Sequence, residues 1–177
     1  MSGAAPAARR SPVSRVIRMI GQSVAWLTLA MVLVTFAMVT LRYGFSMGWV
    51  WLQESVTYLH ATVFMLAIAW TLQVDAHVRV DIFYRDAGPR RQAVVNLAGT
   101  ALFLLPFCVF LILVGWDYVA ASWGLREGSR EAGGLPYVYL LKSLIIAMPA
   151  LLLLQALDDA WRDISLLRSG TADPAVA

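Results

Sequence analysis

Long apolar runs separated by short polar segments dominate the chain. Residues 24–41 and 92–116 carry no charged side chain, and residues 55–74 carry only His60 as a group that titrates near neutral pH. A fourth run, residues 138–157, has a single lysine near its start. Because a helix needs about 20 mostly apolar residues to cross the roughly 30 Å hydrocarbon layer, the pattern predicts four transmembrane helices and an all-α integral membrane fold. The expected spans are about residues 21–41, 52–74, 92–116 and 138–158.

The ends and helix interruptions follow from the same pattern. Val13, Val16, Ile17 and Ile20 share one helical face, which predicts either a short interfacial helix on the inner leaflet or a plain extension of the first span. That span is too long for a cleavable signal peptide and is expected to be retained. Residues 1–12 and 169–177 are expected to be disordered, which leaves 13–168 as the membrane domain. Proline at 106 and at 149 should kink the third and fourth spans.

The distribution of basic residues predicts the orientation. Ten lie on one side of the predicted spans and four on the other, and the richer side faces the cytoplasm under the positive-inside rule. The first set is Arg9, Arg10, Arg15, Arg18, Arg79, Arg85, Arg90, Arg91, Arg162 and Arg168, and the second is Arg42, Arg126, Arg130 and Lys142. Both termini are therefore expected in the cytoplasm, and Lys142 is expected to reach the outer headgroups.

Composition narrows the class of protein. The chain is 60% hydrophobic and 14% charged, which suits a bilayer better than water. Its net charge of +3 does not imply nucleic acid as a partner, because the basic residues sit at helix ends rather than in one patch. A lone cysteine, Cys108, cannot form an internal disulfide or a CxxC metal site.

Candidate chemistry inside the spans is sparse. His60 could be a haem ligand, a proton relay or a packed, hydrogen-bonded residue. A bis-histidine haem would need a second histidine at membrane depth, yet His77 belongs to the second loop. No catalytic, metal or cofactor residue is predicted, and the chain is not expected to be an enzyme by itself.

Charged residues near the span ends suggest structural contacts. Arg42 closes the first span and Glu54 opens the second on the same side, so the two either form an ion pair or are solvated independently. Residues 77–84 mix charged and apolar side chains, which predicts a docked segment or a short interfacial helix. Residues 125–136 are polar and glycine-rich and are expected to form the outer loop. With no repeat and no broken helix aimed at the midplane, any transport path must come from a partner subunit.

Two stretches resemble a known family. Leu41–Tyr84 contains Arg42 and Tyr43 at the end of the first span, Glu54 opening the second, and the His-x-Arg-x-Asp motif of His77, Arg79 and Asp81. Gly134, Leu135 and Pro136 precede the last span and Lys142. Together they resemble the small, DctQ-like membrane subunit of tripartite ATP-independent periplasmic (TRAP) transporters over roughly Arg15–Leu167. One departure is Gln53, where many relatives carry a second acidic residue.

The resemblance implies a multi-pass subunit of the bacterial inner membrane in a sodium-driven, binding-protein-dependent transporter of organic acids. Its implied partners are a large DctM-like membrane subunit, which moves the substrate and is braced by this chain, a periplasmic DctP-like binding protein, and the lipid bilayer. Assembly positions carried over are Arg42, Glu54, His77, Arg79 and Asp81. Arg126, Glu127, Arg130 and Glu131 form the candidate periplasmic partner surface. The Gly-Leu-Pro stretch resembles the branch associated with monocarboxylates, 2-oxo acids, mannitol or chloroaromatic compounds more than it resembles the dicarboxylate branch.

Two other functions remain as alternatives. A self-sufficient, proton-coupled four-helix exporter predicts a charged residue near mid-membrane and transport by the chain alone. A membrane cytochrome or oxidoreductase subunit predicts bound haem or quinone. The sequence lacks the first feature, and the placement of its two histidines argues against the second.

Overall fold

Helices make up every regular element in the computed structural model, which describes residues 11–78, 84 and 87–169. They are α1 (Pro12–Phe45), α2 (Val50–Gln73), α3 (Pro89–Gly99), a π-helical turn η1 (Thr100–Leu104), α4 (Leu105–Leu125) and α5 (Val138–Arg168). The helices α3, η1 and α4 run on without a break, so the described residues contain four helices long and apolar enough to cross a membrane. The expected all-α fold with four spans is confirmed.

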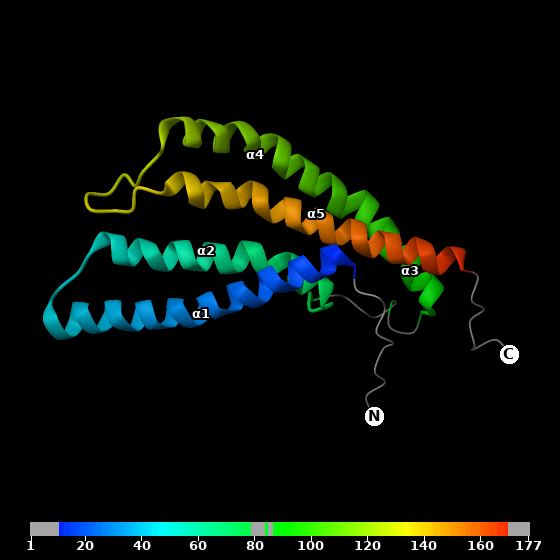
Figure 1. Cartoon of the computed structure of the whole chain (residues 1–177), viewed down its shortest axis with the longest axis horizontal. Coiled ribbons are helices and arrows are strands. Elements are labelled where there is room, and N and C mark those ends of the chain that lie inside the picture. Colours follow the sequence, from blue (N-terminus) through cyan, green and yellow to red (C-terminus); the bar gives the residue numbers. More distant parts are fainter. Residues whose placement is uncertain (1–10, 79–83, 85–86, 170–177) are drawn as a thin grey trace, which may run out of the picture.

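The four spans lie side by side in one curved layer in the order α1, α2, α5, α4 (Figure 1). α2 contacts α1 on one flank and α5 on the other, and α5 contacts α4. The N-terminal part of α1 also contacts α5, where Ser14 bonds to Asp158. Among the described residues, α1 and α4 make no contact, so the helices do not close into a bundle. Both broad sides of the layer therefore stay open, and large apolar side chains such as Trp26, Phe36 and Phe103 are more than two-thirds exposed.

The first helix begins earlier than its predicted span. Ser11 caps it by accepting a hydrogen bond at Oγ from the Ser14 amide (3.0 Å), and Pro12 occupies the first turn, where a missing N–H does no harm. The helix then continues without a break to Phe45. Of the two arrangements expected for residues 13–20, the structure shows the continuous extension. Ser14 and Ile17 are buried there, so this turn packs on protein.

The two prolines affect their helices differently. Pro106 lacks an N–H and crowds the carbonyl one turn earlier, and the backbone directly before it widens into the π-turn η1. The expected distortion of the third span is therefore located at residues 100–104. Pro149 is fully buried, and α5 continues through it as one helix.

Close approach of backbones defines two of the helix seams. A methyl group added at Gly21 of α1 would lie 2.5 Å from the Trp70 side chain of α2. One added at Gly115 of α4 would lie 3.0 Å from the Cγ2 of Ile145 in α5. Small residues at such positions let membrane helices gain van der Waals contact, which matters because lipid provides no hydrophobic drive for association.

Candidate functional site

Glu54 anchors the loop between α4 and α5, residues 126–137, onto α2. Its carboxylate accepts one hydrogen bond from the Ser129 hydroxyl and another from the Leu135 amide, the second at 2.6 Å. Both donors belong to the loop between α4 and α5. Gly134 permits this contact, since a Cβ there would lie 2.8 Å from Glu54 Oε1 and closer still to the Ser129 side chain. Glu54 therefore joins two hairpins that are far apart in sequence.

Of the two arrangements left open for Arg42 and Glu54, the ion pair is not formed among the described residues. Arg42 lies in the last turn of α1, where a cation suits the partial negative charge of the helix end. The carboxylate of Glu54 is satisfied by loop donors instead. The sequence could not show this, because Ser129 and Leu135 are separated from Glu54 by the whole of the third span.

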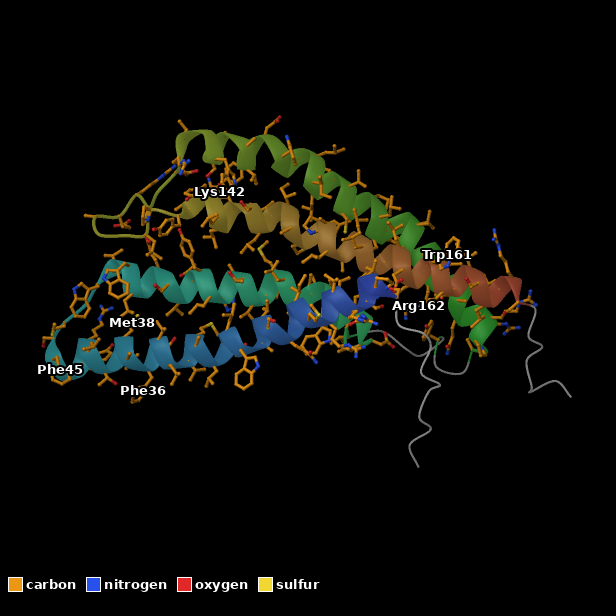
Figure 2. The ribbon with its side chains drawn as sticks, viewed as in Figure 1. Phe36, Met38, Phe45, Lys142, Trp161 and Arg162 are labelled. Atoms are coloured by element: carbon orange, nitrogen blue, oxygen red, sulfur yellow. The ribbon has the colours of Figure 1, made fainter. Side chains whose placement is uncertain are left out.

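Glu127 is the second anchor of the loop. Its carboxylate forms an ion pair with Lys142 Nζ (2.5 Å) and accepts a hydrogen bond from Ser122 Oγ (2.7 Å). The same ammonium lies 3.9 Å from the centre of the Tyr118 ring, a cation–π contact. These hydrogen bonds, the one from Lys142 first, lower the pKa of the Glu127 carboxyl below its ordinary value. Lys142 is thus held by protein groups at the loop end of the layer (Figure 2) rather than directed only to the headgroups.

The remaining loop charges point outward. Arg126, Arg130 and Glu131 are exposed, whereas Glu127 is only partly so. The loop backbone has a fixed shape: the Ser129 amide donates to the Leu135 carbonyl (2.9 Å), and Gly133 has a positive φ of 78° that favours glycine. The structure therefore divides the four predicted surface residues into one internal anchor and three exposed charges of both signs.

A polar network ties α1, α2 and α5 together at the opposite end, where Arg162 is labelled in Figure 2. Ser14 Oγ donates to Asp158 Oδ2 (2.8 Å) and accepts from Arg162 (2.9 Å), which also pairs with Asp158 (2.5 Å). Gln73 Nε2 donates to the Ser14 carbonyl (2.6 Å). Only the i, i+4 spacing of Asp158 and Arg162 was visible in the sequence. Ser14 and Gln73 gave no such signal.

A polar cavity of about 570 Å³ opens beside this network, between α2, α3, η1 and α5. Its polar lining consists of Gln73, Asp75, Tyr84, Asn96, Thr100, Asp159, Arg162 and Asp163. The Oε1 atom of Gln73 is buried and has no hydrogen-bond partner within the described part of the chain. The cavity belongs to the end that charge distribution predicts to be cytoplasmic.

Of the three residues in the predicted His-x-Arg-x-Asp motif, the structure describes only His77. His77 follows α2 in the second loop, and its Nδ1 is buried with no hydrogen-bond partner among the residues that the structure covers. Arg79 and Asp81 lie outside the described residues, as do most of the predicted terminal segments. No group of three His, Cys, Asp or Glu side chains within the described ranges is placed to hold a metal ion.

His60 lies near the middle of α2 and is exposed on the surface of the chain. Its ring stacks on Phe64 with centroids 6.4 Å apart, and Phe64 is itself exposed. The structure therefore does not bury His60 in a packed position within the chain, which was one of the three roles expected for it.

Comparison with known proteins decides the family. The family described as "Tripartite ATP-independent periplasmic transporters, DctQ component" matches residues 31–166. The chain belongs to the DctQ family. The match includes Arg42, Glu54, the second loop and the outer loop, so the resemblance inferred from short motifs is confirmed. With its four apolar helices, the DctQ-family chain is a multi-pass protein of the bacterial inner membrane and a TRAP small permease component.

One curated relative agrees with this assignment. The C4-dicarboxylate TRAP transporter small permease protein DctQ of Vibrio cholerae serotype O1 is 28% identical over 89 residues. The match covers 50% of this chain and 38% of the relative, so the chain matches well under half of the relative's length. No solved structure matches the chain.

Proposed function

We propose that this DctQ-family chain is the small permease subunit of a sodium-coupled, binding-protein-dependent TRAP transporter of organic acids, and that it braces a large DctM-like subunit. The observation that carries the proposal is the open layer of four helices. A single layer cannot enclose a path across the membrane, whereas it offers two extended sides to a neighbouring protein. The substrate and sodium sites then belong to the large subunit.

The two ends of the layer support different tasks. The inner network and the Glu54 and Glu127 anchors fix the relative positions of the helices, as a rigid brace requires. With both termini in the cytoplasm, the loop containing Arg126, Arg130 and Glu131 faces the periplasm, where a DctP-like binding protein docks. Arg42, His77, Arg79 and Asp81 serve assembly in this proposal, together with Glu54.

Substrate class is the finer part of the proposal. The relative from Vibrio cholerae is named for C4-dicarboxylates. The stretch around Gly134, Leu135 and Pro136 resembles the branch associated with monocarboxylates and 2-oxo acids. Both are carboxylates, so we propose an organic acid whose identity is selected by the binding protein.

Co-purification followed by reconstitution tests the function. The tagged chain, co-expressed with the large subunit and extracted in mild detergent, should retain that subunit, identified by mass spectrometry. Proteoliposomes of the pair should take up a monocarboxylate, 2-oxo acid or C4-dicarboxylate when the binding protein and a sodium gradient are present. Uptake should be lost without this chain or when potassium replaces sodium. Recovery of a homo-oligomer that transports alone, driven by protons, would instead establish the exporter.

A further inference from the structure

Four exposed residues form a stripe along α2. They are Gln53, Thr57, His60 and Phe64, and within α2 only Trp51 is exposed besides them. Their spacing of four, three and four residues places them on one helical face. Since α1 and α5 occupy the two flanks of α2, the stripe opens onto one broad side of the layer.

The stripe lies at membrane depth. α2 is about 36 Å long at roughly 1.5 Å per residue, and His60 lies about 15 Å from its first residue. The outer interface is marked by Trp49 and Trp51 at the start of the helix. The imidazole of His60 and the hydroxyl of Thr57 are therefore placed within the hydrocarbon layer, whose thickness is roughly 30 Å.

Lipid is a poor neighbour for this stripe. None of the Gln53, Thr57 and His60 side chains makes a hydrogen bond within the described part of the chain. Polar groups in a bilayer face protein or a water-filled cavity, because hydrocarbon offers them no partner. The third span provides the contrast: from Leu102 in η1 to Trp116 in α4, each exposed side chain is apolar, as a lipid-facing surface requires.

We propose that the α2 stripe, residues 53, 57, 60 and 64, is the docking surface for a transmembrane helix of the large subunit. This inference rests on the proposed function, in which the chain braces a large membrane subunit. The partner helix presents a hydrogen-bonding group opposite His60 and Thr57 and an apolar site for Phe64. The α4 face is left to lipid.

Photo-crosslinking at two matched phenylalanines tests the surface directly. Phe64 is 68% exposed on the stripe and Phe110 is 58% exposed on α4. Each is replaced in turn by p-benzoylphenylalanine in the full chain, co-expressed with the large subunit and irradiated in native membranes. We expect an adduct with the large subunit, identified by mass spectrometry, from position 64 and none from position 110. Adducts only with lipid or with a second copy of this chain at position 64 would overturn the proposal.

A second measurement probes the hydrogen bond of His60. His60→Leu should weaken retention of the large subunit by about 3- to 30-fold, the range expected for one interhelical hydrogen bond. His60→Gln, which keeps a donor and an acceptor, should retain more, and Phe110→Leu should match the wild type. Equal retention by all three variants would contradict the proposal. Because His60 is exposed, the melting temperature of the isolated chain should stay unchanged.

The wild-type chain separates this proposal from the proposed function. If it retains the large subunit while position 64 gives no adduct with that subunit, the docking surface is wrong and the function stands. If the wild type retains no large subunit at all, both fail.

Discussion

Glu54 and Glu127 show how single carboxylates determine the shape of the end of the layer that carries the loop between α4 and α5. Each lies in a different hairpin, and each holds the loop between α4 and α5 through two contacts. A carboxylate that accepts hydrogen bonds from charged or amide donors makes stronger bonds than a neutral acceptor does. The loop that carries the candidate partner surface is thus ordered by residues that themselves face inward.

The pH dependence of stability should report on Glu127. Its pKa is lowered in the folded chain by the hydrogen bonds from Lys142 and Ser122, so the stabilisation is complete above the ordinary glutamate range, about pH 4 to 5, and is lost as pH falls through the lower folded value. We expect the melting temperature in detergent to fall less between pH 6 and about pH 3.5 in Glu127→Gln than in the wild type.

Glu131→Gln provides the matched control for this titration. Glu131 lies in the same loop and is exposed, so its replacement should leave the wild-type pH profile unchanged. A Glu127→Gln profile parallel to that of the wild type would show that the ion pair with Lys142 does not contribute.

At the scale of helices, close packing at Gly21 and the hydrogen bond from Gln73 to the Ser14 carbonyl both fix how α1 meets α2. Gly21 packs against Trp70 because glycine has no side chain, and Val24, one turn further along α1, is also buried. In the third span, the backbone before Pro106, which has no N–H to donate, forms a π-turn, and the helix continues. Local backbone chemistry thus adjusts both the spacing and the course of the spans.

Replacing Gly21 with alanine should destabilise the chain. The added methyl group would lie 2.5 Å from Trp70 atoms, and such overpacking costs about 1 to 3 kcal/mol. Unfolding free energy in mixed detergent micelles measures the change. Gly44→Ala is the control on the same helix, because nothing lies within 4 Å of its Cβ position. A Gly21→Ala variant as stable as Gly44→Ala would mean that the helices can separate there without loss.

At the scale of the whole molecule, the open layer separates three environments. One end carries the ordered loop, the other carries the Ser14–Asp158–Arg162 network beside a polar cavity, and the apolar sides lie between them. Under the proposed function, the ordered loop would meet the binding protein, the network end would face the cytoplasm, and the apolar sides would meet the large subunit or lipid.

Charge reversal at the exposed loop residues should impair binding-protein docking. We expect Arg130→Glu with Glu131→Lys to reduce uptake on the order of tenfold at limiting binding protein and low salt, because surface charges act mainly on association rate. Retention of the large subunit should be unaffected. Arg90→Glu, exposed near the opposite end, is the control. Normal uptake by the double variant would show that the loop does not bind the binding protein.

Sequence reasoning reached the fold class through a local property. In lipid, the backbone N–H and C=O groups of a twenty-residue apolar run must bond to each other, which a helix achieves. The number and approximate position of the spans therefore follow without any knowledge of packing. The family followed from short motifs whose order, from Arg42 through His77 to Pro136, is also local. The sequence singled out Glu54 and Glu127, but it did not predict which residues they contact.

Tertiary structure decided which of these residues meet. Whether Glu54 pairs with Arg42 or with Ser129 depends on which hairpins lie side by side, and hydropathy is the same for any order of the four helices. The order α1, α2, α5, α4 also decides that His60 faces outward, since burial depends on neighbours rather than on the run that contains it. The sequence by itself determined four membrane helices and their family, because these depend on local chemistry. Only packing decided the open layer, the anchored loop and the α2 stripe, because these depend on contacts between distant segments.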